Sequence, residues 1–163
     1  MRLVDAQHDR WHEVTAGDST VAVPAAEPRR ILSIAQWQAV RGSWPAQTPV
    51  GLVVDNDVDI ESVAADLPRL ALIALSFPKW TDGRAYSQAR LLRVRFRFAG
   101  EVRATGDVVA DMLPLLARTG FDAAVLRADQ SPTTALRTLH FFAQGHYHGD
   151  VIEPRPHFAR AAP

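Results

Sequence analysis

The stretch VGLVVDNDVDIESVAADLPRLALIALS (residues 50–76) decides the fold, because it holds two unbroken apolar runs joined by a helical pattern. The runs are VGLVV (50–54) and LALIALS (70–76). Between them, apolar residues recur at the spacing of one helical face: Ile60, Val63, Ala64 and Leu67. Unbroken apolar runs are typical of strands covered on both faces, as in parallel sheets. The stretch therefore predicts a strand–helix–strand unit of a parallel sheet.

The same alternation continues on both sides of this stretch. Downstream we predict a helix over 83–97, a strand over 101–106, a helix over 107–120, a strand over 121–127 and a helix from Ser131-Pro132 to Gly145. Pro114 is expected to kink the third of these elements or to shift its start toward Asp111. Upstream, residues 29–42 form a short strand and a helix, with Ser33 and Gln36 as a capping box.

These elements predict the fold class and the division of the chain. The class is α/β: a mostly parallel sheet of at least four βα units with helices packed on it, preceded by a short β-rich N-terminal segment. We expect a single domain over 1–163, with that segment at 1–28, the βα core at 29–145 and a loose tail at 146–163. In the N-terminal segment, RWHEVTA and STVAVPA predict two short strands joined at Gly17-Asp18.

Composition removes several classes of function. The 18 basic and 18 acidic residues leave no net charge, which argues against a general binder of nucleic acid or membrane surfaces. The chain has no cysteine, so disulfides, thiol chemistry and cysteine-held clusters within it are excluded. No apolar run approaches the roughly 18 residues of a membrane span, and the N-terminus lacks an apolar signal core. We therefore expect a cytoplasmic protein.

Polar residues follow the predicted strands at their carboxyl ends, where parallel sheets bind ligands. The candidates for ligand binding are Asp82, Gly83, Arg84, Ser87, Arg103 and Asp107. The first four begin a helix, whose free N–H groups and partial positive charge favour an anion. The alternative is that such loops are polar simply because they form turns and caps.

Two of these candidates have competing structural roles. Asp82 is a good N-cap, and as a cap it would occupy the donors that an anion needs. Arg103 lies in a strand, EVRATG, whose polar residues all point to one side. Either this is an exposed edge strand, or Arg103 has a carboxylate partner in a polar network and points at the site with Asp82 and Asp107. In the helix after Asp82, Arg90, Arg93 and Arg97 are expected to be solvated or ion-paired.

Metal and nucleotide signatures are weak or missing. The HYH at 146–148 has zinc-like spacing but no evident third ligand, so no metal site is predicted. No GxGxxG, P-loop or GxSxG motif occurs. The sequence does not identify a cofactor.

Three ordered motifs carry a resemblance to a known family: FPKWTDGRAYSQARLLR (77–93), GEVRATGDVVADML (100–113) and RTGFDA (118–123). Over about residues 30–145 the chain resembles the bacterial domain-of-unknown-function family 934. The sequence departs from the family pattern at four positions: Trp80, Val102, Met112 and Pro114. Met112 replaces a glutamine, which matters if that side chain contacts a ligand.

The resemblance implies a pathway rather than a reaction. Members of the family are encoded beside sulfite reductase and are labelled as oxidoreductases of sulfite reduction. This implies an accessory protein of assimilatory sulfate and sulfite reduction that binds a small oxyanion or docks on sulfite reductase. One alternative is an oxidoreductase of the same pathway with a bound flavin or nicotinamide, and a second is a structural homodimer. The missing cysteines and glycine-rich fingerprint favour the accessory protein.

Overall fold

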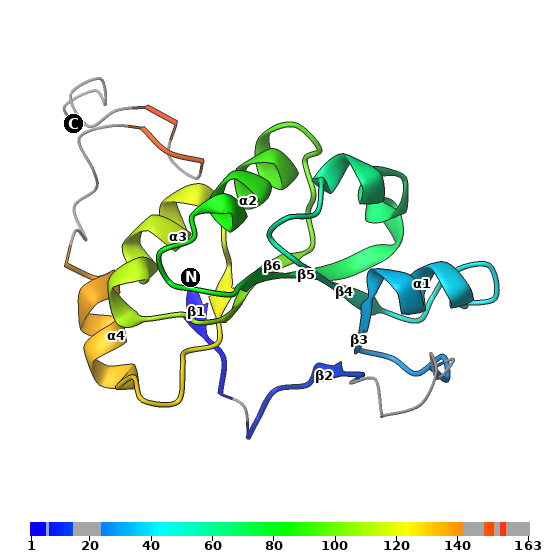
Figure 1. The fold of residues 1–163 in the computed structure, drawn as a ribbon, viewed down its shortest axis with the longest axis horizontal. Coiled ribbons are helices and arrows are strands. Elements are labelled where there is room, and N and C mark those ends of the chain that lie inside the picture. The colour runs from blue at the N-terminus through cyan, green and yellow to red at the C-terminus, as the bar shows by residue number, and fades with distance from the viewer. Residues whose placement is uncertain (6, 15–23, 142–148, 152–153, 156–163) are drawn as a thin grey trace.

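A computed structural model describes residues 1–5, 7–14, 24–141, 149–151 and 154–155 of the chain (Figure 1). Its strands are β1 (Arg2–Leu3), β2 (His12–Glu13), β3 (Arg30–Ser33), β4 (Val50–Val54), β5 (Leu70–Phe77), β6 (Glu101–Gly106) and β7 (Ala123–Ala124). Its helices are α1 (Ile34–Val40), α2 (Arg84–Val94), α3 (Leu113–Thr119) and α4 (Pro132–Leu139), with 3₁₀ helices η1 (Ile60–Arg69) and η2 (Ala110–Met112).

The strands form one sheet in the order β1-β7-β6-β5-β4-β3-β2, and every neighbouring pair is parallel. This confirms the predicted α/β class with helices on a parallel sheet. The strands predicted at 50–54 and 101–106 have the predicted bounds, and β5 extends one residue further, to Phe77. Because all strands run the same way, their carboxyl ends meet along one edge of the sheet.

The two faces of the sheet are covered differently (Figure 1). The helices pack on one face, where side chains such as Trp37, Leu75, Phe77 and Phe121 form the main core. The N-terminal segment runs along the other face, from β1 at one edge to β2 at the other. There Trp11 packs against a smaller apolar cluster that includes Leu72 of β5. The sheet is therefore buried on both sides, as its apolar strands predict.

The N-terminal segment differs from its prediction. No strand was expected at β1, which pairs with β7. The first predicted strand contains β2, which pairs in parallel with β3. The physical reason is the free edge of β3, which offers unpaired backbone groups. Accordingly the N–H groups of His12 and Val14 donate to the carbonyls of Arg29 and Ile31 at 3.0 and 2.9 Å. Residues 15–23, which hold most of the second predicted strand, lie outside the described residues.

Several predicted bounds are also corrected. The element predicted as a helix between β4 and β5 is the 3₁₀ helix η1, capped by the Asp59 side chain on the Glu61 N–H at 2.9 Å. Helix α2 ends at Val94 rather than residue 97. Strand β7 has two residues instead of seven, and α4 ends at Leu139 rather than Gly145, which lies outside the described residues. The predicted tail over 146–163 is also mostly outside them.

Other local predictions are confirmed. Ser33 and Gln36 form the reciprocal capping box at the start of α1. Pro114 lies in the first turn of α3, which begins at Leu113, and so shifts the helix start rather than kinking it. Gly120 ends α3 in the left-handed conformation, at φ 104°. Among the described residues no helix combines the length and the hydropathy needed to cross a bilayer.

Candidate functional site

The loop between β5 and α2 places Asp82 and Arg84 against each other. The Asp82 carboxylate accepts hydrogen bonds from Nε and Nη2 of Arg84 at 3.1 and 2.8 Å, and from the Arg84 backbone N–H at 3.2 Å. These contacts hold the pKa of Asp82 well below its usual range and raise the pKa of Arg84. The N-cap of α2 is Gly83 rather than the expected Asp82, but Asp82 still accepts from the Arg84 backbone N–H and neutralises the Arg84 guanidinium. Both effects lower the affinity of this helix start for an anion.

Asn56 lies beside this pair at the carboxyl end of β4. It is only 7% exposed, and its amide helps to lower the pKa of Asp82. Its Nδ2 atom nevertheless makes no hydrogen bond of good geometry within the described residues. Gln88 of α2 ties the helix to the same loop, because its Nε2 donates to the carbonyls of Asp55 and Val58 at 2.9 and 2.8 Å. The loops after β4 and β5 are thus joined through α2.

Gly83 and Ser87 lie on the exposed side of the α2 start. Gly83 has φ −86°, and a Cβ atom there would meet only Cδ2 of Tyr86, at 3.7 Å. The position is therefore open, as close approach by a ligand requires, but the backbone itself does not need glycine. Ser87 lies one helical turn further along the same surface.

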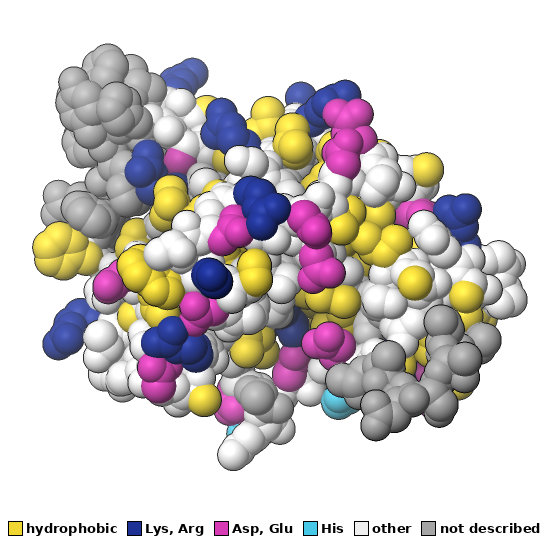
Figure 2. All heavy atoms as spheres, viewed as in Figure 1, with side chains coloured by type: hydrophobic (Ala, Val, Ile, Leu, Met, Phe, Trp, Pro, Cys, Tyr) yellow, Lys and Arg dark blue, Asp and Glu magenta, His cyan; other side chains and the backbone are white. Residues whose placement is uncertain are grey.

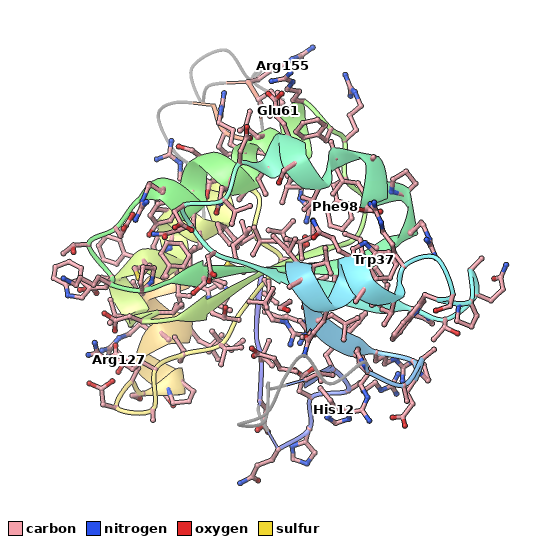
Figure 3. All side chains as sticks on the ribbon, turned by 45° about the vertical axis from the view of Figure 1, so that its right-hand side comes forward. His12, Trp37, Glu61, Phe98, Arg127 and Arg155 are labelled. Atoms are coloured by element: carbon pink, nitrogen blue, oxygen red, sulfur yellow. The ribbon has the colours of Figure 1, made fainter. Side chains whose placement is uncertain are left out.

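Asp107 begins the next loop and connects it to two others. Its Oδ2 accepts from the Trp80 backbone N–H at 2.9 Å, and its Oδ1 accepts from Nη1 of Arg127 at 2.6 Å. Arg127 also donates to both carboxylate oxygens of Asp129, at 2.6 and 2.8 Å. Figure 3 shows Arg127 on the loop that leads into α4. Asp107 therefore holds together the loops that follow β5, β6 and β7.

The electrostatics of this cluster follow from its hydrogen bonds. The bond from the Trp80 N–H, followed by that from Arg127, lowers the pKa of Asp107. The bond from Arg127 lowers the pKa of Asp129 to about 2, and the two carboxylates raise the pKa of Arg127. All three groups stay charged at neutral pH, so neither carboxyl is suited to act as a general acid there. Alternating basic and acidic side chains are visible over the face drawn in Figure 2.

Arg103 lies apart from these loops. It is 2% exposed and belongs to a cluster on the face of the sheet opposite the helices, which we call the Arg103 cluster: Arg2, Asp9, Glu101 and Arg103. Arg103 donates to Asp9 from Nη1 at 2.5 Å and to Glu101 from Nε at 2.8 Å. Partial burial acts to raise the pKa of Asp9, but hydrogen bonds from Arg103 and the Trp11 N–H lower it overall. The edge-strand interpretation of EVRATG is wrong, because β6 lies between β5 and β7.

The structure thus brings some predicted residues together and separates others. Asp82, Gly83, Arg84 and Ser87 gather at the start of α2, and Asp107 contacts the same loop through Trp80. Arg103 instead joins the N-terminal segment to the sheet. Ligand binding by any of these residues stays a prediction.

A pocket missed by the sequence reasoning lies next to Asp107, and we call it the Trp80 pocket. Its volume is about 530 Å³. It is lined by Trp80, Tyr86, Val109, Asp111, Met112, Leu115, Arg127 and Gln130. Trp80 and Leu115 are 55% and 44% exposed although both are apolar. The sequence feature that could have indicated this pocket is Trp80, because it lies within a motif of the family resemblance and close to the end of a predicted strand.

Interactions behind the Trp80 pocket fix its walls. The Tyr86 ring packs edge-on against Phe77 and Phe121, with centroids 5.2 and 6.4 Å away. Burial raises the pKa of Tyr86, so its phenol stays protonated and can donate a hydrogen bond. The Gln130 side chain accepts from the Ala110 N–H at 3.0 Å, which joins the loop before α4 to η2. Among the described residues no group of three or more His, Asp or Glu side chains is placed to hold a metal ion.

Comparison with known proteins supplies the identity. No curated protein matches the chain. The model of a family described as "Bacterial protein of unknown function (DUF934)" matches residues 51–158, which run from the second residue of β4 through α4 and include every loop of the Trp80 pocket. This match covers more than half of the sequence and contains all three motifs on which the resemblance rests. The chain therefore belongs to the DUF934 family.

Proposed function

We propose that this chain is an accessory protein of assimilatory sulfite reduction that docks on sulfite reductase through the Trp80 pocket. The pathway comes from the gene neighbourhood that the family resemblance implies. The observation that carries the docking mode is the exposure of Trp80 and Leu115 at the rim of a pocket of about 530 Å³. Exposed aromatic and aliphatic side chains around a hollow are characteristic of interaction sites.

The charges at the carboxyl edge favour docking over binding of a small oxyanion there. The arginines at this edge are engaged by carboxylates: Arg84 by Asp82, and Arg127 by Asp107 and Asp129. To bind either guanidinium, an oxyanion would have to displace the carboxylate that already neutralises that guanidinium. The pocket also carries Asp111, which is exposed. The lining holds one acid, Asp111, and one base, Arg127, and Arg127 is already paired with Asp107 and Asp129. Together these groups carry more negative than positive charge, which complements a basic patch on the partner.

Substitution of Trp80 tests this proposal. We expect Trp80→Ala to weaken binding to the bacterium's own sulfite reductase at least about tenfold, because tryptophans at interface centres contribute strongly to affinity. Binding is measured by titration calorimetry between the purified proteins. The control is Val94→Ala, which truncates an exposed apolar side chain that lies outside the pocket, at the end of α2. If the wild-type proteins form no complex, or if both variants bind like the wild type, the proposal fails.

A second candidate function is an oxidoreductase of the same pathway with a bound flavin or nicotinamide. The observation that favours it is the position of the Trp80 pocket at the carboxyl ends of β5, β6 and β7, where parallel sheets bind small molecules. Its volume of about 530 Å³ suits such a ligand, and Trp80 and Tyr86 offer faces for an aromatic ring. A flavin spectrum in the purified protein would favour this candidate over docking. So would quenching of tryptophan fluorescence on addition of nicotinamide nucleotides, if the quenching is weaker in Trp80→Phe.

A further inference from the structure

A second hollow lies on the opposite side of the sheet from the main core, and we call it the N-terminal pocket. Its volume is about 450 Å³. Its charged and titratable lining residues are Arg2, Asp5, His8, Asp9, Arg10 and Arg29. Five of them come from the N-terminal segment, and Arg29 directly precedes β3. In Figure 3 the labelled His12 marks this side of the sheet, whereas Trp37 and Phe98 lie among the helices.

The acidic groups of the N-terminal pocket are already engaged. Asp5 accepts from the His8 ring and the Gln7 N–H, at 2.7 and 2.9 Å. Asp9 accepts from Arg103, which itself is buried. Arg2 keeps its contact with Glu101 at 2.8 Å. The carboxylates in and behind this pocket are therefore paired with groups other than Arg10 and Arg29.

Arg10 and Arg29 are those remaining arginines. Both are exposed, and within the described residues neither guanidinium is paired with a carboxylate or a backbone carbonyl. In and directly behind the pocket, four arginines face three carboxylates, and His8 adds a positive charge when protonated. The sign of the charge is thus opposite to that of the Trp80 pocket. A guanidinium that lacks a carboxylate partner favours an anionic oxygen group.

The backbone at Arg29 supports a specific placement of this side chain. Arg29 has φ 63°, a left-handed conformation that is unfavourable for a residue with a side chain. It is held there from both sides, because its N–H donates to the Pro49 carbonyl at 2.7 Å and its carbonyl accepts from the His12 N–H at 3.0 Å. Such conformations persist where the surroundings fix them, often near functional sites. Arg29, which lines the pocket, is therefore held in this conformation by its backbone bonds to Pro49 before β4 and to His12 of β2.

We propose that the N-terminal pocket binds a small molecule through an oxyanion group, with Arg10 and Arg29 as the two cationic contacts. The shared chemistry is that of a carboxylate, a sulfate or a phosphate, each of which accepts paired hydrogen bonds from guanidinium. This site is separate from the Trp80 pocket, since the two have no lining residue in common. A positive or negative result for anion binding here is therefore independent of the result for docking on sulfite reductase.

Titrations with simple anions test the proposal and identify the group. The full chain is titrated with sulfate, phosphate and acetate at constant ionic strength, and amide chemical shifts are followed by NMR. We expect saturable shifts at Trp11 and Arg29 with at least one anion. Preference for sulfate or phosphate indicates a tetrahedral oxyanion, and preference for acetate indicates a carboxylate ligand. Absence of saturable shifts with all three anions overturns the proposal.

Two variants locate the binding. Arg29→Gly removes the side chain and tolerates φ 63°, and Arg10→Gln removes the second cation. We expect each to weaken anion binding about tenfold, since each removes one charge-assisted contact. Arg90→Gln, at an exposed arginine of α2, is the matched control and is expected to bind like the wild type. Equal binding by Arg10→Gln and the wild type overturns the proposal even if Arg29→Gly is poorly folded.

Discussion

Two glycines of the family motifs have opposite requirements. At Gly106, φ is 88°, and a Cβ atom would lie 2.5 Å from the Phe77 carbonyl oxygen. That same oxygen accepts from the Asp107 N–H at 2.8 Å, so the close approach at the ends of β5 and β6 depends on the missing side chain. At Gly83 the backbone is ordinary and the nearest atom to a Cβ would be 3.7 Å away. Of these two glycines, only Gly106 is required by the backbone conformation and the packing around it.

Substitution by alanine separates these two positions. We expect Gly106→Ala to lower the free energy of unfolding by about 2–4 kcal/mol, because it combines a strained φ with a steric clash. Gly83→Ala is the control, with a change within about 0.5 kcal/mol. Urea denaturation followed by circular dichroism measures both. Equal stability of the two variants would contradict the role given to Gly106.

Arginine side chains have several environments in this chain, and sequence alone does not distinguish them. Arg93 was expected to be solvated or ion-paired, and an ion pair is present, but its side chain is only 15% exposed and also donates to the carbonyls of Phe98, Gly100 and Gly120. It also pairs with Asp122. Arg93 therefore links α2 to the loops before β6 and β7. Nothing in the helical periodicity indicates these partners, because they lie outside the helix.

At the scale of elements, the N-terminal segment stabilises the sheet from the side without helices. Its anchor is the contact between Asp9 and the buried Arg103 of β6. A buried arginine requires carboxylate partners, and Glu101 from its own strand supplies the second. The segment thus completes the environment of a charge that would otherwise be left inside the protein.

Removal of the Asp9 charge tests this role. We expect Asp9→Asn to lower the free energy of unfolding by about 3 kcal/mol, because it leaves Arg103 buried with one carboxylate instead of two. Asp5→Asn, in the same segment but in an exposed contact with His8, is expected to have a much smaller effect. Thermal unfolding by calorimetry compares the two. A stability of Asp9→Asn equal to that of Asp5→Asn would show that the segment does not depend on this contact.

At the scale of the whole molecule, the aspartates with arginine partners make stability depend on pH. The pKa values of Asp9, Asp82, Asp107 and Asp129 are all lower in the folded protein than in the unfolded chain. As the pH falls, the unfolded state therefore binds protons first. The stabilisation is present above the unfolded pKa of about 4 and is lost as the pH falls through the folded values. For Asp129 the folded value is about 2.

We therefore expect the free energy of unfolding to decrease steadily from about pH 4 down to about pH 2. Urea midpoints measured across this range test the expectation. Asp9→Asn lacks one of the contributing groups, so its stability should depend less steeply on pH than that of the wild type. A flat profile, or stability that rises on acidification, would show that these ion pairs do not contribute to folding.

Much of the architecture could be predicted because local physics specifies it. The apolar runs of β4 and β5, the capping box of α1 and the glycine that ends α3 depend on neighbouring residues, and all were predicted. The candidate site was predicted less completely. The start of α2 and Asp107 do share one region, but the Trp80 pocket is formed by residues from three separate stretches of the chain, which follow β5, β6 and β7. No spacing within one segment indicates such a pocket.

The sequence by itself determined the parallel α/β core and the place of its loops, because hydrophobic periodicity and caps are short-range properties. Only the tertiary structure decided what the arginines contact. It brought Asp9 to Arg103 across 94 residues and Asp107 to Arg127 across 20. It also placed the N-terminal segment along the second face, since pairing of β1 with β7 and of β2 with β3 depends on edges that exist only after the sheet has formed.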